Sequence, residues 1–149
     1  MHIGEICTIN TIFCKRDETV QAAALLMRTH HVGDLVVVDQ PNGEPVPVGI
    51  VTDRDIVVSV IALELDPASL LVGDIMSDDL LTCNQGDDVY ETIERMRLRG
   101  IRRVPVLNAN GGLAGIVSAD DMLGFLAEEM GELARIAPHQ QSQEKRARH

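Results

Sequence analysis

The chain has 149 residues, of which 45% are hydrophobic and 24% are charged, a composition typical of one folded domain or of two small fused modules. Its net charge of −10 argues against DNA, RNA or an anionic membrane as the main partner, because like charges repel. Aromatic residues are limited to Phe13, Tyr90 and Phe125, so a stacking surface for single-stranded nucleic acid is not expected.

Three cysteines, Cys7, Cys14 and Cys83, form no Cys-x-x-Cys motif. An odd count without that motif predicts free thiols in a reducing compartment. The first ten residues lack a basic segment followed by a long apolar run, so no signal peptide is expected. The longest apolar stretch, residues 56–65, is too short to span a bilayer. We therefore predict a cytoplasmic protein without a membrane partner.

The sequence repeats itself, first with an offset of 69 residues and then with an offset of 66. Residues 3–8 match residues 72–77, and residues 49–55 match residues 115–121. The offset changes in a turn rich in proline and glycine, where the backbone tolerates length changes. Two copies of one unit predict two similar domains. We place repeat 1 at 1–66, repeat 2 at 67–127, and a helix extension with a flexible basic tail at 128–149.

In chain order, the first copy predicts a short strand, an amphipathic helix, two β-branched strands joined by an Asn-Gly turn, and a second helix. The first helix has apolar residues three and four positions apart, and Thr19 stands at its N-cap position. This β-α-β-β-α order occupies residues 11–14, 20–31, 35–38, a strand ending at 51, and 53–64.

The second copy predicts the same order. Asp88 takes the N-cap position of its first helix, and with Glu91 it completes a predicted capping box. Pro105 lies inside a predicted strand, which places that strand at an edge or beside a bulge. The last helix, from Ala119 to about Ala137, carries a long apolar stripe. This stripe indicates either packing on the protein's own core or a surface for self-association.

The junction between the last strand and the last helix of each copy carries a hydroxyl and a carboxylate three residues apart. The pairs are Thr52 with Asp55 and Ser118 with Asp121. This spacing is first of all that of a helix-capping box. The alternative is nucleotide binding, since a helix start suits a phosphate and a carboxylate one turn later can accept hydrogen bonds from both ribose hydroxyls. A glycine in the preceding strand would let another group approach the backbone closely.

Phosphate binding also needs cations, and five arginines are concentrated between residues 95 and 103. Arg95 and Arg99 share one helix face and are expected to project to solvent, where they could pair with Glu91 and Glu94 of the same helix. Arg102 and Arg103 stand at the junction of helix and strand. Their guanidinium groups there would hold a phosphate bidentately or form surface salt bridges.

The ordered set of motifs resembles a tandem pair of CBS domains, also called a Bateman module. The resemblance rests on residues 72–77, on residues 100–106 and on both Gly-Ile-Val-(Thr/Ser)-x-x-Asp segments, and it covers residues 1 to about 127. It implies an α/β fold of the α+β kind, in which two β-α-β-β-α repeats pack as a pseudo-twofold pair that often dimerises. It also implies adenosyl nucleotides as ligands in two clefts between the repeats: AMP, ADP or ATP, and also NAD or S-adenosylmethionine. No other cofactor is required.

The resemblance implies roles for individual residues. Asp55 and Asp121 would hold the ribose hydroxyls, and Thr52 and Ser118 would contact ribose or phosphate. The adenine base would lie between apolar residues, with polar side chains at its edge. The apolar residues are Ile50, Ile116, Ile12 and Leu81, and the polar ones are Thr8, Ser77 and Thr82.

The resemblance also implies that Arg102 and Arg103 would reach the phosphates. The first copy departs from this pattern, because Gly33 and Asp34 stand at the matching positions. Asp34 would repel a phosphate. The two clefts are therefore expected to differ, and one of them to prefer a less charged ligand or to stay empty.

These predictions lead to a non-enzymatic regulatory module that senses cellular energy or redox state through an adenosyl nucleotide. It would act as a homodimer on a protein partner that the sequence does not identify. The sequence contains no P-loop and no Gly-x-Ser-x-Gly motif. The adjacent histidines His30 and His31 diverge, so no metal site is expected.

Two other functions stay open. In a ligand-independent interaction scaffold, both Thr/Ser-x-x-Asp motifs would be helix caps only. In a thiol-based redox sensor, Cys14 and Cys83, which are equivalent in the two copies, would form the reactive pair. The ordinary interpretation of these cysteines is that they are buried apolar residues of a strand.

Overall fold

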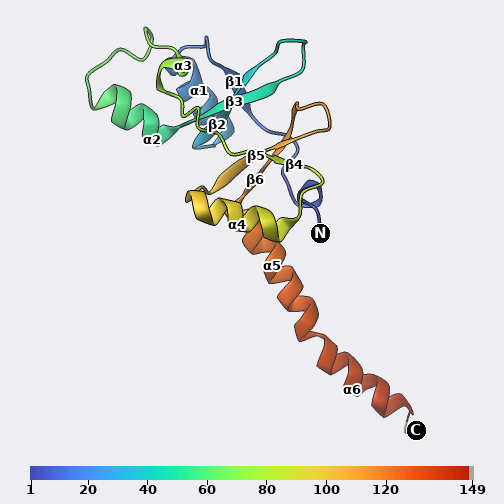
Figure 1. The fold of residues 1–149 in the computed structure, drawn as a ribbon. Coiled ribbons are helices and arrows are strands. Elements are labelled where there is room, and N and C mark those ends of the chain that lie inside the picture. The colour runs from blue at the N-terminus through green and yellow to red at the C-terminus, as the bar shows by residue number, and fades with distance from the viewer. Residues whose placement is uncertain (148–149) are drawn as a thin grey trace.

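The computed structural model describes residues 1–147, which form two units of the same design (Figure 1). Each unit has a three-stranded mixed sheet, in which the first strand runs parallel and the third antiparallel to the central one. The predicted β-α-β-β-α order is confirmed in both copies. The first unit contains β1 (Phe13–Lys15), α1 (Val20–His30), β2 (Asp34–Asp39), β3 (Val46–Thr52), α2 (Asp53–Ile56) and a π-helical turn η2 (Val57–Ile61).

The second unit repeats these elements and ends in a longer helix. It contains β4 (Cys83–Asn84), α4 (Val89–Arg99), β5 (Arg103–Leu107), β6 (Leu113–Ser118) and α5 (Ala119–Ala134), which is followed by α6 (Ile136–Ala147). Two short helices that the sequence analysis did not expect precede the units: η1 (Ile3–Glu5) and α3 (Val72–Ile75).

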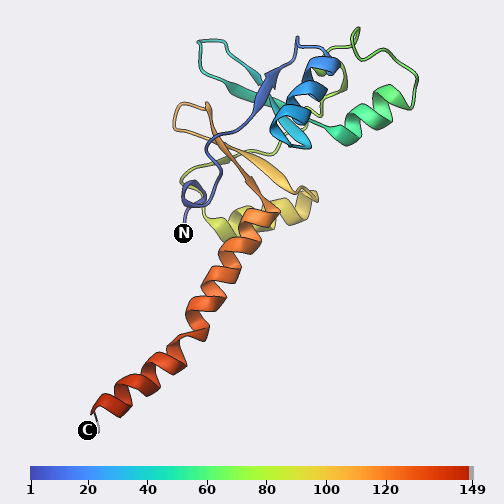
Figure 2. The ribbon, with the colours of Figure 1, turned by 180° about the vertical axis from the view of Figure 1, so that it is seen from behind.

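Each of these short helices packs on the other unit. Ile3 is buried in the core of the second unit, and Val72 is buried in the core of the first. Backbone hydrogen bonds hold each short helix on the other unit. The Ile3 N–H donates to the Asp87 carbonyl (2.9 Å), and the Val72 N–H donates to the Glu18 carbonyl (2.8 Å). The N-terminus accordingly lies beside the second unit in both views (Figures 1 and 2). Each core therefore draws residues from both sequence repeats.

Side chains cap the N-termini of α1 and α4. The Thr19 hydroxyl accepts from the Ala22 N–H (3.1 Å), so the predicted N-cap of α1 is confirmed. Asp88 caps α4 through the Glu91 N–H (3.1 Å), but in the described chain the Glu91 side chain makes no return bond. The predicted capping box at α4 is therefore wrong. The N-terminal segment covers this helix start, where the Val89 N–H donates to the Met1 carbonyl (3.2 Å).

Pro105 lies in β5, the central strand of its sheet, so its predicted edge position is wrong. The strand tolerates proline because neither neighbouring strand requires a hydrogen bond from the backbone N–H that proline lacks. On one side β4 pairs only with Val106 and Leu107. On the other side the backbone groups of Ile116, opposite Pro105, bond to Thr8 instead. The predicted bulge lies next to Pro105, at the register shift between Val106 and Leu107.

Helices α5 and α6 form an arm that extends away from both units (Figures 1 and 2). In its apolar stripe (Leu123, Leu126, Met130, Leu133 and Ala137), Leu126 packs against the core of the second unit, whereas Leu123, Met130 and Leu133 are each more than 60% exposed. Self-association through this stripe stays a prediction. The tail that was expected to be flexible is helical through Ala147, with all of α6 exposed.

Within residues 1–147, no helix combines the length and the apolar character that crossing a membrane requires.

Candidate functional site

Two clefts lie where the two units meet, and the repeat offset relates them. The first cleft has a volume of about 240 Å³, and the second has a volume of about 170 Å³. Seven positions of the first cleft have an equivalent in the second. These matched pairs are Thr8 and Ser77, Asn10 and Asp79, Thr11 and Leu80, Ile12 and Leu81, Val32 and Ile101, Asp34 and Arg103, and Ile116 and Ile50.

Each cleft is built from the lead-in segment that precedes the first strand of one repeat (residues 3–12 or 72–82) and from the third strand of the other repeat. Thr8 and Ile116 exchange two backbone hydrogen bonds, of 2.9 and 3.0 Å. Ser77 and Ile50 do the same, at 3.0 and 2.9 Å. The lead-in segments thereby extend both sheets and place apolar side chains from both repeats along one cleft.

The glycine before each Thr/Ser-x-x-Asp motif serves this pairing. A Cβ atom on Gly49 would stand 2.7 Å from the Ser77 carbonyl oxygen, and one on Gly115 would collide with the Thr8 carbonyl oxygen. The group that approaches the glycine backbone is thus the chain's own lead-in segment. The glycines are explained without a ligand.

Both Thr/Ser-x-x-Asp motifs form complete capping boxes. The Thr52 hydroxyl accepts from the Asp55 N–H (3.1 Å), and the Asp55 carboxylate accepts from the Thr52 N–H (2.9 Å). Ser118 and Asp121 repeat this geometry at the same two distances. The capping interpretation is confirmed, and each carboxylate uses one oxygen for it.

These four residues do not line either cleft in the described chain. Asp121 instead borders a hollow of about 430 Å³ at the base of the arm. Four further carboxylates, from Glu5, Asp120, Glu128 and Glu129, line this hollow, so its charge disfavours a phosphate. The ribose-binding roles of Asp55 and Asp121 stay predictions.

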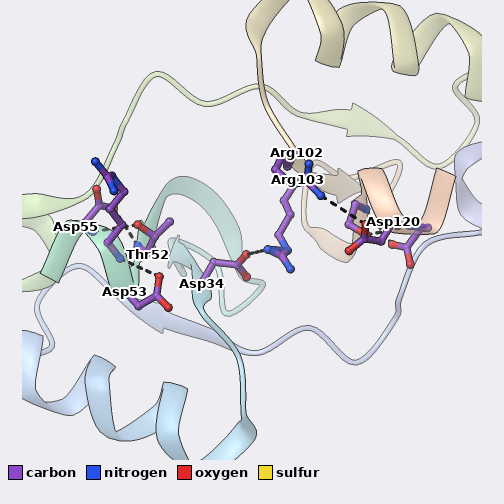
Figure 3. Close-up of polar contacts among 10 residues, drawn as sticks. Asp34, Thr52, Asp53, Asp55, Arg102, Arg103 and Asp120 are labelled. Carbon is purple, nitrogen blue, oxygen red and sulfur yellow. Dashed lines mark hydrogen bonds and ion pairs between the residues drawn. The ribbon is translucent and has the colours of Figure 1, made fainter. Parts of the chain in front are cut away.

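The two adjacent arginines point to different places (Figure 3). Arg103 lines both clefts, and its Nη1 donates to Asp34 Oδ2 at 2.5 Å. Arg102 faces Asp120 at 3.5 Å instead and lines an apolar hollow between α4 and α5. Successive residues entering a strand project to opposite sides, so the two guanidinium groups do not act as one clamp.

Asp34 is the more buried member of the central ion pair. Its side chain is 17% exposed, whereas that of Arg103 is 47% exposed. Burial raises the pKa of the Asp34 carboxyl, the nearby Asp53 raises it further, and Arg103 opposes both effects. The carboxylate therefore depends on Arg103 for its charge compensation.

Arg95 and Arg99 bind the lead-in segment of the second cleft. Arg99 bonds the Asp79 carboxylate (2.9 Å), and Arg95 bonds the Thr82 carbonyl (2.8 Å) and faces Asp87 (3.6 Å). The predicted pairing of Arg95 and Arg99 with glutamates of their own helix is wrong, because these long side chains reach across to the lead-in segment. Thr82 contributes its carbonyl to this bracing and lies outside both cleft linings.

Seven of the site residues predicted from the sequence line the clefts: Thr8, Ile12, Ile50, Ser77, Leu81, Arg103 and Ile116. The polar pair Asn10 and Asp79 and the histidine of the first cleft, His31, also line them and were not predicted. The repeat offset was the signal for the polar pair, since both residues lie two positions after a predicted site residue. Within residues 1–147, no group of three or more His, Cys, Asp or Glu residues is placed to hold a metal ion.

The cysteines have the environment of apolar core residues. Cys14 and Cys83 are buried, and burial raises the pKa of each thiol to about 12. A thiol with so high a pKa carries almost no reactive thiolate at neutral pH. This environment confirms their interpretation as buried strand residues and removes the basis for a redox pair.

Alkylation of the native protein tests this environment. At pH 8 we expect iodoacetamide to modify Cys7, which is half-buried, at least ten times faster than Cys14 or Cys83. Burial raises the pKa of all three thiols, but Cys14 and Cys83 are more deeply buried and their pKa values reach about 12. Peptide mass spectrometry measures the three rates, and the unfolded protein in denaturant is the control, in which all three should react alike. Rapid native modification of Cys14 or Cys83 would contradict the assignment.

Comparison with known proteins assigns both repeats to the same family. Residues 3–61 and 72–128 each match the CBS domain family. YlbB of Bacillus subtilis is 35% identical over 135 residues, which cover 91% of this chain and 87% of YlbB. The uncharacterised protein MK0525 of Methanopyrus kandleri is 36% identical over 121 residues, which cover 81% of this chain and 60% of MK0525. The chain thus spans about three fifths of the length of that relative.

A similar arrangement is found among solved structures. The CBS domain pair of protein MJ0100, solved in complex with 5′-methylthioadenosine and S-adenosyl-L-methionine, superposes with a TM-score of 0.73. The alignment covers 87% of this chain and 98% of that one, at 22% sequence identity. At this identity the likeness concerns the fold.

Proposed function

This chain belongs to the CBS domain family and carries two such domains in tandem, and from that premise we propose that it is a regulatory module that binds an adenosyl nucleotide in the clefts between its repeats. The observation that supports the proposal is the pair of related clefts, each walled by residues of both repeats. The CBS pair of MJ0100, which has the same fold, was solved with two adenosyl compounds.

The cleft walls suit a nucleoside base. Ile12 and Ile116 would sandwich the base in the first cleft, and Leu81 and Ile50 would do so in the second. Thr8 and Ser77 supply polar groups at the lead-in edge, and Arg103 supplies a cation for phosphate. Apolar walls with a few converging polar groups are the usual features of small-molecule sites.

The capping carboxylates would serve the same clefts. Asp121 follows β6, whose Ile116 lines the first cleft, and Asp55 follows β3, whose Ile50 lines the second. We propose that the carboxylate oxygen left over from capping accepts hydrogen bonds from the ribose. Thr52 and Ser118 would then hold that carboxylate in place through its cap.

Binding would also move the repeats. Both clefts are smaller than the about 300 Å³ at which small-molecule sites begin, so a bound nucleotide would part the two units. Such a change in their relative orientation is what a protein partner would detect. Its extent is limited by the difference in ligand affinity between the two orientations.

Thermal unfolding tests the proposal against AMP, ADP, ATP, NAD and S-adenosylmethionine, with GTP as the comparison. A ligand at 100 times its Kd should raise the unfolding free energy by about 2.7 kcal/mol, which is several degrees in Tm for a chain of this size. We expect adenosyl compounds to give this shift and GTP to give a much smaller one.

Two variants with a matched control localise the ligand. Ile116→Ala and Ile50→Ala each remove one wall and should reduce the shift at their own cleft, whereas Ile9→Ala, at a residue 75% exposed, should leave it unchanged. If no adenosyl compound shifts Tm up to millimolar concentration, and none co-purifies, the proposal fails.

A second candidate function is that of a ligand-independent interaction scaffold. The complete capping boxes favour it, because they explain both Thr/Ser-x-x-Asp motifs without a ligand. The exposed apolar stripe of the arm offers a surface for a second copy or another protein. A negative result in the ligand experiment would leave this candidate as the function of the chain.

A further inference from the structure

Arg103 is one cation shared by two sites. Its side chain lines both clefts, and among residues 1–147 no other arginine or lysine lines either of them. His31 adds an imidazole to the first cleft only. Arg102 is directed away to Asp120, and Arg99 is held by Asp79. Two phosphate-bearing ligands would thus have to share a single guanidinium group.

The partner of Arg103 stands at the equivalent position of the other repeat. Asp34 and Arg103 are separated by the repeat offset of 69 residues and begin equivalent strands, β2 and β5. Their side chains point toward each other (Figure 3), which is expected for equivalent positions close to the axis of a pseudo-twofold pair. Strand pairing fixes both backbones, because Asp34 lies opposite Thr52 and Arg103 lies opposite Ser118.

Loss of Arg103 would leave Asp34 poorly compensated. Its side chain is 17% exposed, and it already lies near the carboxylate of Asp53. Asp34 lines the first cleft but not the second. An uncompensated carboxylate in that position repels an anion and attracts a cation in the first cleft.

We propose that the Asp34–Arg103 pair couples the two clefts, so that a phosphate-bearing ligand in the second cleft excludes another from the first and makes the first selective for a cationic adenosyl ligand. The inference rests on the proposed function and specifies its regulation. A phosphate in the second cleft draws the guanidinium group from Asp34, and Asp34 then turns the first cleft negative. Because coupling is reciprocal, a cation in the first cleft also strengthens phosphate binding in the second.

Isothermal titration of the whole chain with ATP, adenosine and S-adenosylmethionine tests the coupling. The wild-type protein should bind two molecules of adenosine, which has no phosphate, but one of ATP, with the second ATP at least tenfold weaker. In the ATP-saturated protein, S-adenosylmethionine, whose sulfonium is cationic, should bind at least tenfold more tightly than adenosine does.

Substitutions at Asp34 should change these results in a defined way. Asp34→Arg gives each cleft its own guanidinium group and should allow two ATP molecules of similar affinity. Asp34→Asn, a milder change, should abolish the preference for S-adenosylmethionine in the ATP-saturated protein. Arg102→Gln is the matched control, because the neighbouring arginine lies outside both clefts, and it should behave as wild type. Binding of two adenosines shows that each variant is folded.

The failures of the two proposals are distinguishable. If the wild-type protein binds two ATP molecules with equal and independent affinity, or if Asp34→Asn keeps the cation preference, the coupling is wrong and adenosyl binding stands. If none of the three compounds binds, both proposals fail.

Discussion

Gly115→Ala should lower the unfolding free energy by about 3–5 kcal/mol and disrupt the first cleft at the same time. The new Cβ would collide with the Thr8 carbonyl oxygen, which is backbone and has little room to move. Overpacking of this kind costs about 1–3 kcal/mol, and losing the two Thr8–Ile116 hydrogen bonds costs about 1 kcal/mol each. Equilibrium denaturation in urea measures the change.

Gly86→Ala is the matched control for that variant. A Cβ on Gly86 meets no atom within 4 Å, so this substitution should change the unfolding free energy by no more than about 1 kcal/mol in either direction. If Gly115→Ala were as stable as Gly86→Ala, the lead-in segment would not pair with β6 in the way described.

Ile3→Ala should cost about 2–5 kcal/mol, the usual penalty for emptying a fully buried isoleucine site. Ile3 is buried in the core of the second unit, although it belongs to the first repeat. Ile9→Ala removes the same atoms from an exposed site and should change the unfolding free energy by less than about 0.5 kcal/mol. Urea denaturation of the two variants gives the comparison.

Amide hydrogen exchange distinguishes the packing described here, in which Ile3 lies in the core of the second unit, from packing of Ile3 on its own repeat. In Ile3→Ala, amides of β4 and α4 should exchange faster, while those of β1 and α1 should be less affected. Faster exchange confined to β1 and α1 would show that residue 3 packs on its own repeat.

Much of the fold could be predicted because its signals are local. The alternation of β-branched strands with amphipathic helices, the caps at Thr19, Thr52 and Ser118, and the turns all depend on residues within a few positions of one another. Because the unit occurs twice, each of these local patterns appears twice in the sequence. The capping half of the Thr/Ser-x-x-Asp interpretation could be predicted for the same reason, since both partners lie in one helical turn.

The exchange of lead-in segments could not be predicted in this way. The repeat offset shows that Ile3 and Val72 are equivalent, but two similar cores offer each of them the same apolar environment. Which core each one enters depends on the path of the whole chain. The error at Pro105 has the same origin, because the backbone groups of Ile116 that would face it bond to Thr8 of the distant lead-in segment.

The separation of the two adjacent arginines has a simpler cause. A rule based on composition groups Arg102 and Arg103 together, whereas the alternation of side chains at the start of a strand sends them to opposite sides. The ion pair of Arg103 with Asp34 joins residues 69 positions apart. The sequence showed that these positions match, but only the packing of the two units shows that they touch.

The exchanged lead-in segments also set an order of events during synthesis. Residues 2–8 leave the ribosome early, but their partners Asp87 and Ile116 are added much later. At about 5–20 residues per second, Thr8 waits roughly 5–20 s for Ile116 to be made. The first unit can close as soon as Val72 emerges, whereas the second must capture a segment that has already been waiting in the open. A slow-translating stretch between residues 72 and 116 would prolong that exposure.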